Sequence, residues 1–73
     1  MTDRNRTQHG VLTFQLLGEK WPVQVLYSQS GFFIGTEDDL GLTVSRESEE
    51  YFGTLDSAKE ALATGNWTQR IRT

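Results

Sequence analysis

Apolar and polar residues alternate along much of the chain between residues 11 and 45, a pattern that is typical of β-strands with one buried face. The alternation predicts four strands, at residues 11–17, 21–27, 32–36 and 42–45. The second and third form the clearest pair, because the apolar residues from Trp21 to Tyr27 fall on one face and the small polar residues 28–31 favour a reversal. We therefore expect a β-hairpin at the centre of an antiparallel sheet.

One helix is predicted near the C-terminal end. Thr54 is a suitable N-cap and Gly65 stands where helices commonly end, so the helix spans about ten residues between them. Its apolar stripe faces the sheet and consists of Leu55, Ala58, Ala61 and Leu62. Trp67, just past the cap, is expected to fold back as a lid on the core, with its indole N–H reaching water or a carbonyl.

These elements predict an α+β fold, in which an antiparallel β-meander of about four strands carries one C-terminal α-helix packed on one face. Residues 1–9 are predicted to be a flexible polar arm, residues 10–67 a single domain and residues 68–73 a C-terminal tail. Residues 69–73 also alternate, so a short added strand stays open as an alternative. Residues 45–50 are open between a strand, a bulge and a helical turn, before the chain continues as a strand to residue 53.

The predicted order, an aromatic-bearing sheet followed by a helix, is similar to the small arm-type DNA-binding domains at the N-termini of some tyrosine integrases. The resemblance covers residues 21–65, and the run from Phe52 to Ala58 that opens the helix carries it most directly. It implies a three-stranded sheet that binds DNA through Lys and Arg on its exposed face. Arg46 is the one basic residue that this sheet offers, among acids, so the resemblance concerns pattern and fold.

Composition narrows the class of protein. The chain has 73 residues, of which 36% are hydrophobic and 23% charged, and a domain of this size buries only a thin core. Cysteine is absent, which excludes a disulfide framework and a thiolate metal site and fits a reducing cytoplasm. The first residues are polar, so we expect a cytoplasmic protein with neither a signal segment nor a membrane anchor.

The formal net charge of −3 is distributed unevenly. Between Thr7 and Gln69, three basic residues face nine acidic ones, and an acidic body repels the phosphates of nucleic acids. The basic residues of the two ends have the opposite effect and make nucleic-acid binding the alternative function. They are the candidate phosphate contacts Arg4, Arg6, Arg70 and Arg72.

No stretch carries a catalytic or metal-binding pattern. His9 is the only histidine and has no ligand partner nearby in the sequence. The acids at residues 37–39 are consecutive, whereas a calcium loop spaces its acids at alternate positions. The serines within residues 45–48 lack an identifiable general base and oxyanion donors. We therefore expect a non-enzymatic protein without a cofactor or a metal.

The most suggestive apolar position is Phe33 in the predicted third strand. Two interpretations stay open: Phe33 packs against Trp67 or the N-terminal arm, or it anchors a partner, as isolated aromatic residues often do at interfaces. Gly35 leaves a notch for close approach beside it. The acidic strand edge adds the candidate partner contacts Arg46, Glu47 and Glu49. We expect a small interaction or regulatory accessory module that binds an unidentified protein, as a monomer or as a dimer through an open strand edge.

Overall fold

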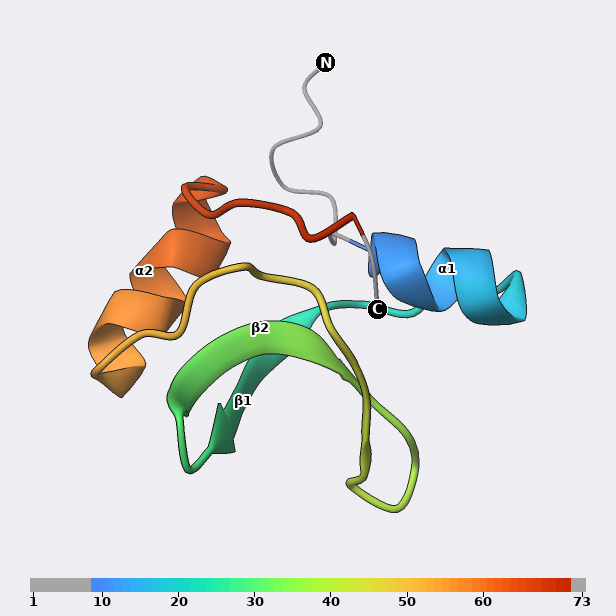
Figure 1. Ribbon diagram of the computed structural model, residues 1–73, viewed down its shortest axis with the longest axis horizontal. Coiled ribbons are helices and arrows are strands. Elements are labelled where there is room, and N and C mark those ends of the chain that lie inside the picture. Colours follow the sequence, from blue (N-terminus) through green and yellow to red (C-terminus); the bar gives the residue numbers. More distant parts are fainter. Residues whose placement is uncertain (1–8, 72–73) are drawn as a thin grey trace.

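A three-stranded antiparallel sheet and two helices make up residues 9–71, the part of the chain that the computed structural model describes (Figure 1). The elements follow in the order α1 (Val11–Leu17), β1 (Gln24–Ser28), β2 (Gly31–Glu37), β3 (Thr43–Arg46) and α2 (Leu55–Thr64). The predicted α+β class is confirmed. The sheet has three strands instead of about four, and two helices are present instead of one.

The predicted central hairpin is present. β1 and β2 pair antiparallel, with Ser28 opposite Gly31 at the turn. Gly31 has a φ of 130°, and a Cβ there would lie 2.9 Å from the carbonyl oxygen of Phe52, so the position requires glycine. β1 begins at Gln24 and not at Trp21, because the proline between them pairs with the N-terminal segment instead of with β2.

The segment after β3, which the sequence left open, is a bulge. The N–H groups of Glu47 and Ser48 both donate to the carbonyl of Ile34, at 2.8 and 3.0 Å. Two residues against one is the pattern of a β-bulge. The chain then returns to the edge of β2, where Phe52 and Phe32 exchange two backbone hydrogen bonds, so the strand direction continues as predicted.

α2 covers one half of the sheet through an apolar core. The hydroxyl of Thr54 accepts a hydrogen bond from the N–H of Ser57 at 3.1 Å, and Gly65 ends the helix with a φ of 77°, both as predicted. Partly buried Trp67 packs on this core as the expected lid, but its buried indole N–H has no partner among the described residues. The core consists of Val23, Ile34 and Ala61, with Phe52, Leu62 and Trp67 packed against it.

The predicted first strand is wrong, because residues 11–17 form the helix α1. The helix ends at Gly18, whose N–H donates to the carbonyl of Phe14 at 2.7 Å. Gly18 takes the positive φ that the sequence suggests, at 71°, but as a helix C-cap and not as a hairpin turn. Contacts with distant residues, described below, favour the helix over the strand that the local alternation suggests.

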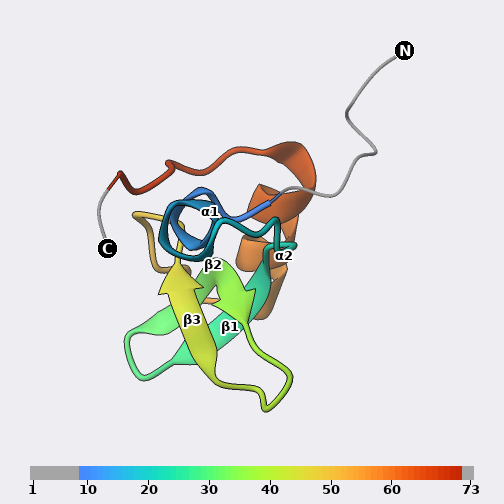
Figure 2. The ribbon, with the colours of Figure 1, turned by 90° about the vertical axis from the view of Figure 1, so that its right-hand side faces the viewer.

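Both helices lie on the same face of the sheet (Figures 1 and 2). Ile34 under α2 and Thr36 under α1 are two residues apart on β2, and such side chains point to the same side of a strand. Figure 2 shows α1 along its axis above β2 and β3. The opposite face carries Leu26 beside Phe33, whose ring packs edge-on against Tyr51 with the ring centres 6.0 Å apart.

The segment from Thr68 to Arg70 runs beside the bulge. The N–H of Glu49 donates to the carbonyl of Thr68 at 2.8 Å, and the N–H of Arg70 donates to the carbonyl of Glu47 at 2.7 Å. The described part of the C-terminal end thus forms a single β-bridge, between Ser48 and Gln69, and not a strand of the sheet. Of the predicted N-terminal arm only His9 is described; residues 1–8 and 72–73 lie outside the described residues.

Candidate functional site

The carboxylate of Glu47 holds the N-terminus of α1. Its Oε1 accepts a hydrogen bond from the N–H of Leu12 at 3.0 Å, and its Oε2 accepts one from the N–H of Thr13 at 3.2 Å. These N–H groups have no partner inside a helix, and a negative charge at this end also suits the helix dipole. The cap therefore comes from the bulge after β3, 35 residues beyond Leu12 in the sequence.

Gly10 allows this carboxylate to approach the helix. Its N–H donates to the carbonyl of Trp21 at 2.8 Å. A Cβ built on Gly10 would lie 2.7 Å from Oε2 of Glu47 and 2.7 Å from Cγ2 of Thr36, closer than side chains pack. The φ of −74° suits any residue, so the position requires glycine for space and not for backbone conformation.

Three hydroxyl groups and one amide complete the surroundings of the carboxylate. Ser45 donates to Oε2 of Glu47 at 2.6 Å, and Thr13 donates to Ser45 at 2.9 Å. The hydroxyl of Thr36 lies 2.7 Å from that of Thr13 and 2.8 Å from that of Ser45. The side-chain amide of Gln69 donates to Oε1 at 2.7 Å. Glu47 and the three hydroxyl residues are buried, and they satisfy one another's hydrogen bonds, as burial requires.

Burial alone would raise the pKa of Glu47, because it penalises the charged form. The hydrogen bonds from the N–H of Leu12, the Ser45 hydroxyl, the Gln69 amide and the N–H of Thr13 outweigh this effect and hold the pKa below the ordinary 4.5. Glu47 is therefore ionised at neutral pH, although its exposed fraction is 0%. It has no proton to donate there and no oxygen facing solvent, so we assign it a structural role.

The helix that this cluster holds presents apolar side chains to solvent. Of its seven residues, only Leu12 and Thr13 are buried. Figure 1 shows α1 extending away from the sheet. Four large side chains are 43–64% exposed, and we call them the α1 face: Val11, Phe14, Leu16 and Leu17. They are four of the ten large exposed hydrophobic residues in the described chain, which makes this short helix its densest exposed apolar surface.

A groove of about 190 Å³ opens beside the α1 face. Val11 and Phe14 line it together with His9, Gly10 and Lys20. Its walls are almost entirely apolar, and the exposed Lys20 adds a positive charge. The groove has the size and character to receive one large apolar side chain from another molecule.

The structure places most of the predicted partner contacts in internal positions. Phe33 is 4% exposed and packs against Tyr51, not against the residues expected from the sequence. Glu47 is buried under α1. Arg46 is half-buried, with its guanidinium carbon 4.6 Å from the centre of the Tyr51 ring and its Nη1 bonded to two carbonyls of the bulge. Glu49 is exposed.

The notch predicted at Gly35 is occupied from within the protein. A Cβ there would collide with the carbonyl oxygen of Ser45 and would lie 3.1 Å from the ring of Phe33. The absent side chain therefore allows β3 and Phe33 to approach β2. It leaves no opening for a partner.

Of the four arginines predicted to contact phosphate, Arg70 lies within the described residues. It is half-buried, and its Nη1 donates to the carbonyl of Arg46 at 3.3 Å. Arg4, Arg6 and Arg72 lie outside the described residues. Nucleic-acid binding through these side chains stays a prediction.

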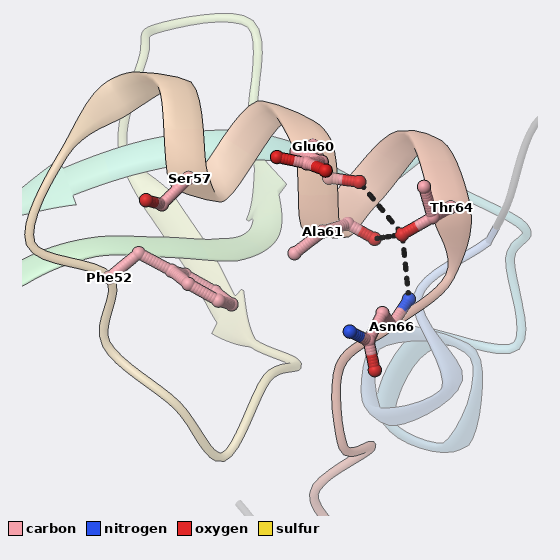
Figure 3. A pocket seen from close by; sticks show the side chains of 6 residues that line it. All are labelled: Phe52, Ser57, Glu60, Ala61, Thr64 and Asn66. Atoms are coloured by element: carbon pink, nitrogen blue, oxygen red, sulfur yellow. Dashed lines mark hydrogen bonds between the residues drawn. The ribbon is translucent and has the colours of Figure 1, made fainter.

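A larger groove, of about 460 Å³, lies along α2 (Figure 3). It is lined by Phe52, Ser57, Glu60, Ala61, Thr64 and Asn66. The hydroxyl of Thr64 donates to the carbonyl of Glu60 at 2.9 Å and accepts from the N–H of Asn66 at 3.3 Å. The hydroxyl of Ser57 accepts from Thr54 at 2.9 Å. Because these hydroxyls serve the two ends of α2, this groove is a weaker candidate than the α1 face.

Neither a metal cluster nor a membrane-spanning helix is found among residues 9–71. No three histidine, aspartate or glutamate side chains in this range are arranged to share a metal ion. Asp38 of the acidic turn bonds its own loop, with Oδ1 accepting from the N–H groups of Leu40 and Leu42, both at 2.9 Å. Both described helices fall short of the length and apolar character that a bilayer requires.

The sequence does not predict the α1 face, because the alternation in residues 11–17 favours a strand. One signal pointed to it. Val11 and Leu12 are adjacent, as are Leu16 and Leu17, so a strand would carry large apolar side chains on both faces. A thin sheet cannot bury both, which indicates surplus apolar surface in this segment.

Comparisons with known proteins add no relative. No family model matches the sequence, and no curated protein and no solved structure matches it. The inference of function therefore starts from the residues of this chain.

Proposed function

We propose that this protein is a small cytoplasmic, non-enzymatic interaction module that binds a partner protein through the α1 face. The observation that carries the proposal is the exposure of four large apolar side chains on a helix of seven residues. Exposed apolar patches are typical of interaction sites, and Val11 and Phe14 line one groove together. The cytoplasmic and non-enzymatic parts rest on the sequence, which has no cysteine and no catalytic pattern.

The way in which α1 is held supports this proposal. A helix of seven residues is not stable in water by itself. Two N–H groups of α1 bond a buried carboxylate, and hydrogen bonds to charged groups contribute about 1.5–3 kcal/mol each. The protein thus fixes the helix through the Glu47 carboxylate and the buried Leu12 and Thr13, while its other apolar side chains stay exposed. That arrangement suits the presentation of those side chains to a partner.

Burial of the α1 face would supply a useful binding free energy. Full burial of a Leu, Val or Phe side chain contributes about 1.5–3 kcal/mol, and about half of this remains for side chains that are already half covered. The four residues together then offer about 4 kcal/mol, which corresponds to roughly a thousandfold in Kd. Phe14, which lines the apolar groove, is the expected anchor.

Substitution of Phe14 by aspartate tests the proposal. Immobilised wild-type protein is incubated with extract of the producing organism, and bound proteins are crosslinked and identified by mass spectrometry. We expect a partner that wild type recovers and Phe14→Asp loses, because a charge in the groove opposes apolar burial. Leu40→Asp is the matched control, since it puts the same charge on a loop side chain that is 82% exposed.

Circular dichroism establishes that each variant keeps its helix content before the comparison is made. A partner that is recovered equally by wild type and Phe14→Asp would contradict the proposal. So would a partner that Leu40→Asp loses as completely as Phe14→Asp does.

A further inference from the structure

A second groove, lined in part by acidic residues, lies outside the α1 face. It measures about 250 Å³ and lies between the segment before β1 and the hairpin that joins β2 to β3. It is lined by Trp21, Pro22, Gln24, Glu37, Asp38 and Asp39. The groove therefore combines an aromatic ring and a proline with three carboxylates, whereas the groove beside α1 is apolar.

Some side chains of this acidic groove already have hydrogen-bond partners within the protein, and others do not. Asp38 bonds two N–H groups of its own loop. The side-chain carboxylates of Glu37 and Asp39 accept no hydrogen bond and pair with no base among the described residues. The indole of Trp21 is fixed by the bond from its Nε1 to Oε1 of Glu19, at 2.8 Å. An oriented ring and two unpaired carboxylates thus remain for a ligand.

Residues 20–22 contribute to both grooves. Lys20 lines the groove beside α1, whereas Trp21 and Pro22 line the acidic groove. This segment is fastened to the start of α1, because the N–H of Gly10 donates to the carbonyl of Trp21 at 2.8 Å and His9 pairs with Pro22. A partner segment that crosses residues 20–22 would contact both grooves.

We propose that the acidic groove binds a Lys or Arg side chain from the same partner segment whose large apolar side chain fills the groove beside α1. This inference rests on the proposed function and names the chemistry of its partner. The cation lies on the ring of Trp21, where the cation–π interaction favours it, and pairs with Glu37 and Asp39. The excess of acids in the body of the chain attracts such a segment as it approaches.

A random peptide library displayed on phage, selected on the wild-type protein, tests this inference. We expect the selected peptides to share one large apolar residue and one Lys or Arg at a constant spacing. The synthetic form of a selected peptide is then titrated by fluorescence anisotropy. Phe14→Asp should abolish binding, and the double variant Glu37→Gln/Asp39→Asn should weaken it about fivefold, because exposed charge pairs contribute modestly.

The loss in the double variant should shrink at high salt, since salt screens exposed charges. Asp56→Asn/Glu60→Gln is the matched control. It removes the same charge from two exposed positions outside both grooves and should leave the affinity unchanged.

The possible outcomes separate this inference from the proposed function. Peptides that depend on Phe14 but lack an enriched basic residue, or that bind the double variant as tightly as wild type, would overturn the inference and leave the proposed function standing. Failure to select any Phe14-dependent peptide would overturn both. A dimer of the wild-type protein that the double variant abolishes would assign the acidic groove to a second copy of the chain, and so overturn the inference as well.

Discussion

The two helices cover the same face of one sheet by opposite means. α2 packs on Ile34 through Ala61 and its neighbours, an apolar contact. α1 lies on Thr36 and Ser45 through the hydroxyl of Thr13 and is capped by the ionised Glu47. The outer sides differ in the reverse sense, because α2 exposes charged residues whereas α1 exposes apolar ones.

This difference between the helices shows that the exposed apolar surface of the protein is concentrated on α1. A helix that stabilises a domain buries its apolar side and exposes its polar side, as α2 does. α1 buries Thr13 and leaves Phe14 and Leu16 about half exposed or more. Of its apolar side chains only Leu12 is buried, so a partner would gain the free energy of burying the exposed remainder of the α1 face.

Ile34→Ala disrupts the apolar packing of α2 on the sheet and has the largest expected effect. Ile34 is 0% exposed, and truncation of a buried isoleucine to alanine destabilises by about 2–5 kcal/mol. We expect a loss of about 3 kcal/mol in the free energy of unfolding, measured by urea denaturation. A loss below about 1 kcal/mol would mean that the contact under α2 is not the main core.

Glu47→Gln disrupts the polar contacts that hold α1 on the sheet. The amide has nearly the shape of the carboxylate, but it loses the charge, and one oxygen becomes an NH₂ that faces other donors. We expect a loss of about 2 kcal/mol. Hydrogen exchange should show faster exchange for the amides of α1 and little change for those of α2. Equal loss of protection in both helices would contradict the claim that α1 and α2 are held by separate contacts.

Gly10→Ala tests the close packing around the Glu47 carboxylate, because it adds a methyl group without changing the charge. The new methyl group would press on Oε2 of Glu47 and on Thr36, and such overpacking destabilises by about 1–3 kcal/mol. Gly53→Ala is the matched control, because a Cβ there meets nothing within 4 Å and Gly53 has no positive φ. Thermal unfolding should separate the two variants; equal melting temperatures would contradict the close approach at Gly10.

Thr54→Ala has the smallest expected effect and compares a local cap with a distant one. Thr54 caps the residue three positions further along, in α2, and loss of such a cap destabilises by about 1 kcal/mol. Urea denaturation should give a smaller loss than for Glu47→Gln. The reverse order would mean that the buried carboxylate contributes less to stability than an exposed hydroxyl.

The sequence predicts those parts of the fold whose determinants are local. Thr54 and Gly65 bracket α2 within the sequence, and the turn before Gly31 specifies the central hairpin. The predicted contact of Leu62 with the core also follows from its place on the helix stripe. In each case the residues that decide the structure are neighbours in the chain.

The parts that the sequence does not predict depend on residues far apart. α1 is selected over a strand by the carboxylate of Glu47, and no pattern within residues 11–17 records that contact. Phe33 is covered by Tyr51, whose position follows from the bulge after β3. The exposed apolar surface consequently lies on α1 and not at Phe33.

The central claim is that the ionised carboxylate of Glu47 holds α1 in place. Because the folded protein lowers the pKa of Glu47 below 4.5, this carboxylate stabilises the fold above pH 4.5, and the stabilisation is lost as the pH falls through the lowered pKa.

The most direct test is an NMR titration that follows the side-chain carboxyl of Glu47 together with the amide protons of Leu12 and Thr13. We predict that the carboxyl titrates below pH 4.5 and that both amide shifts follow the same midpoint. A carboxyl that titrates at or above pH 4.5, or amide shifts that are insensitive to its titration, would contradict the claim.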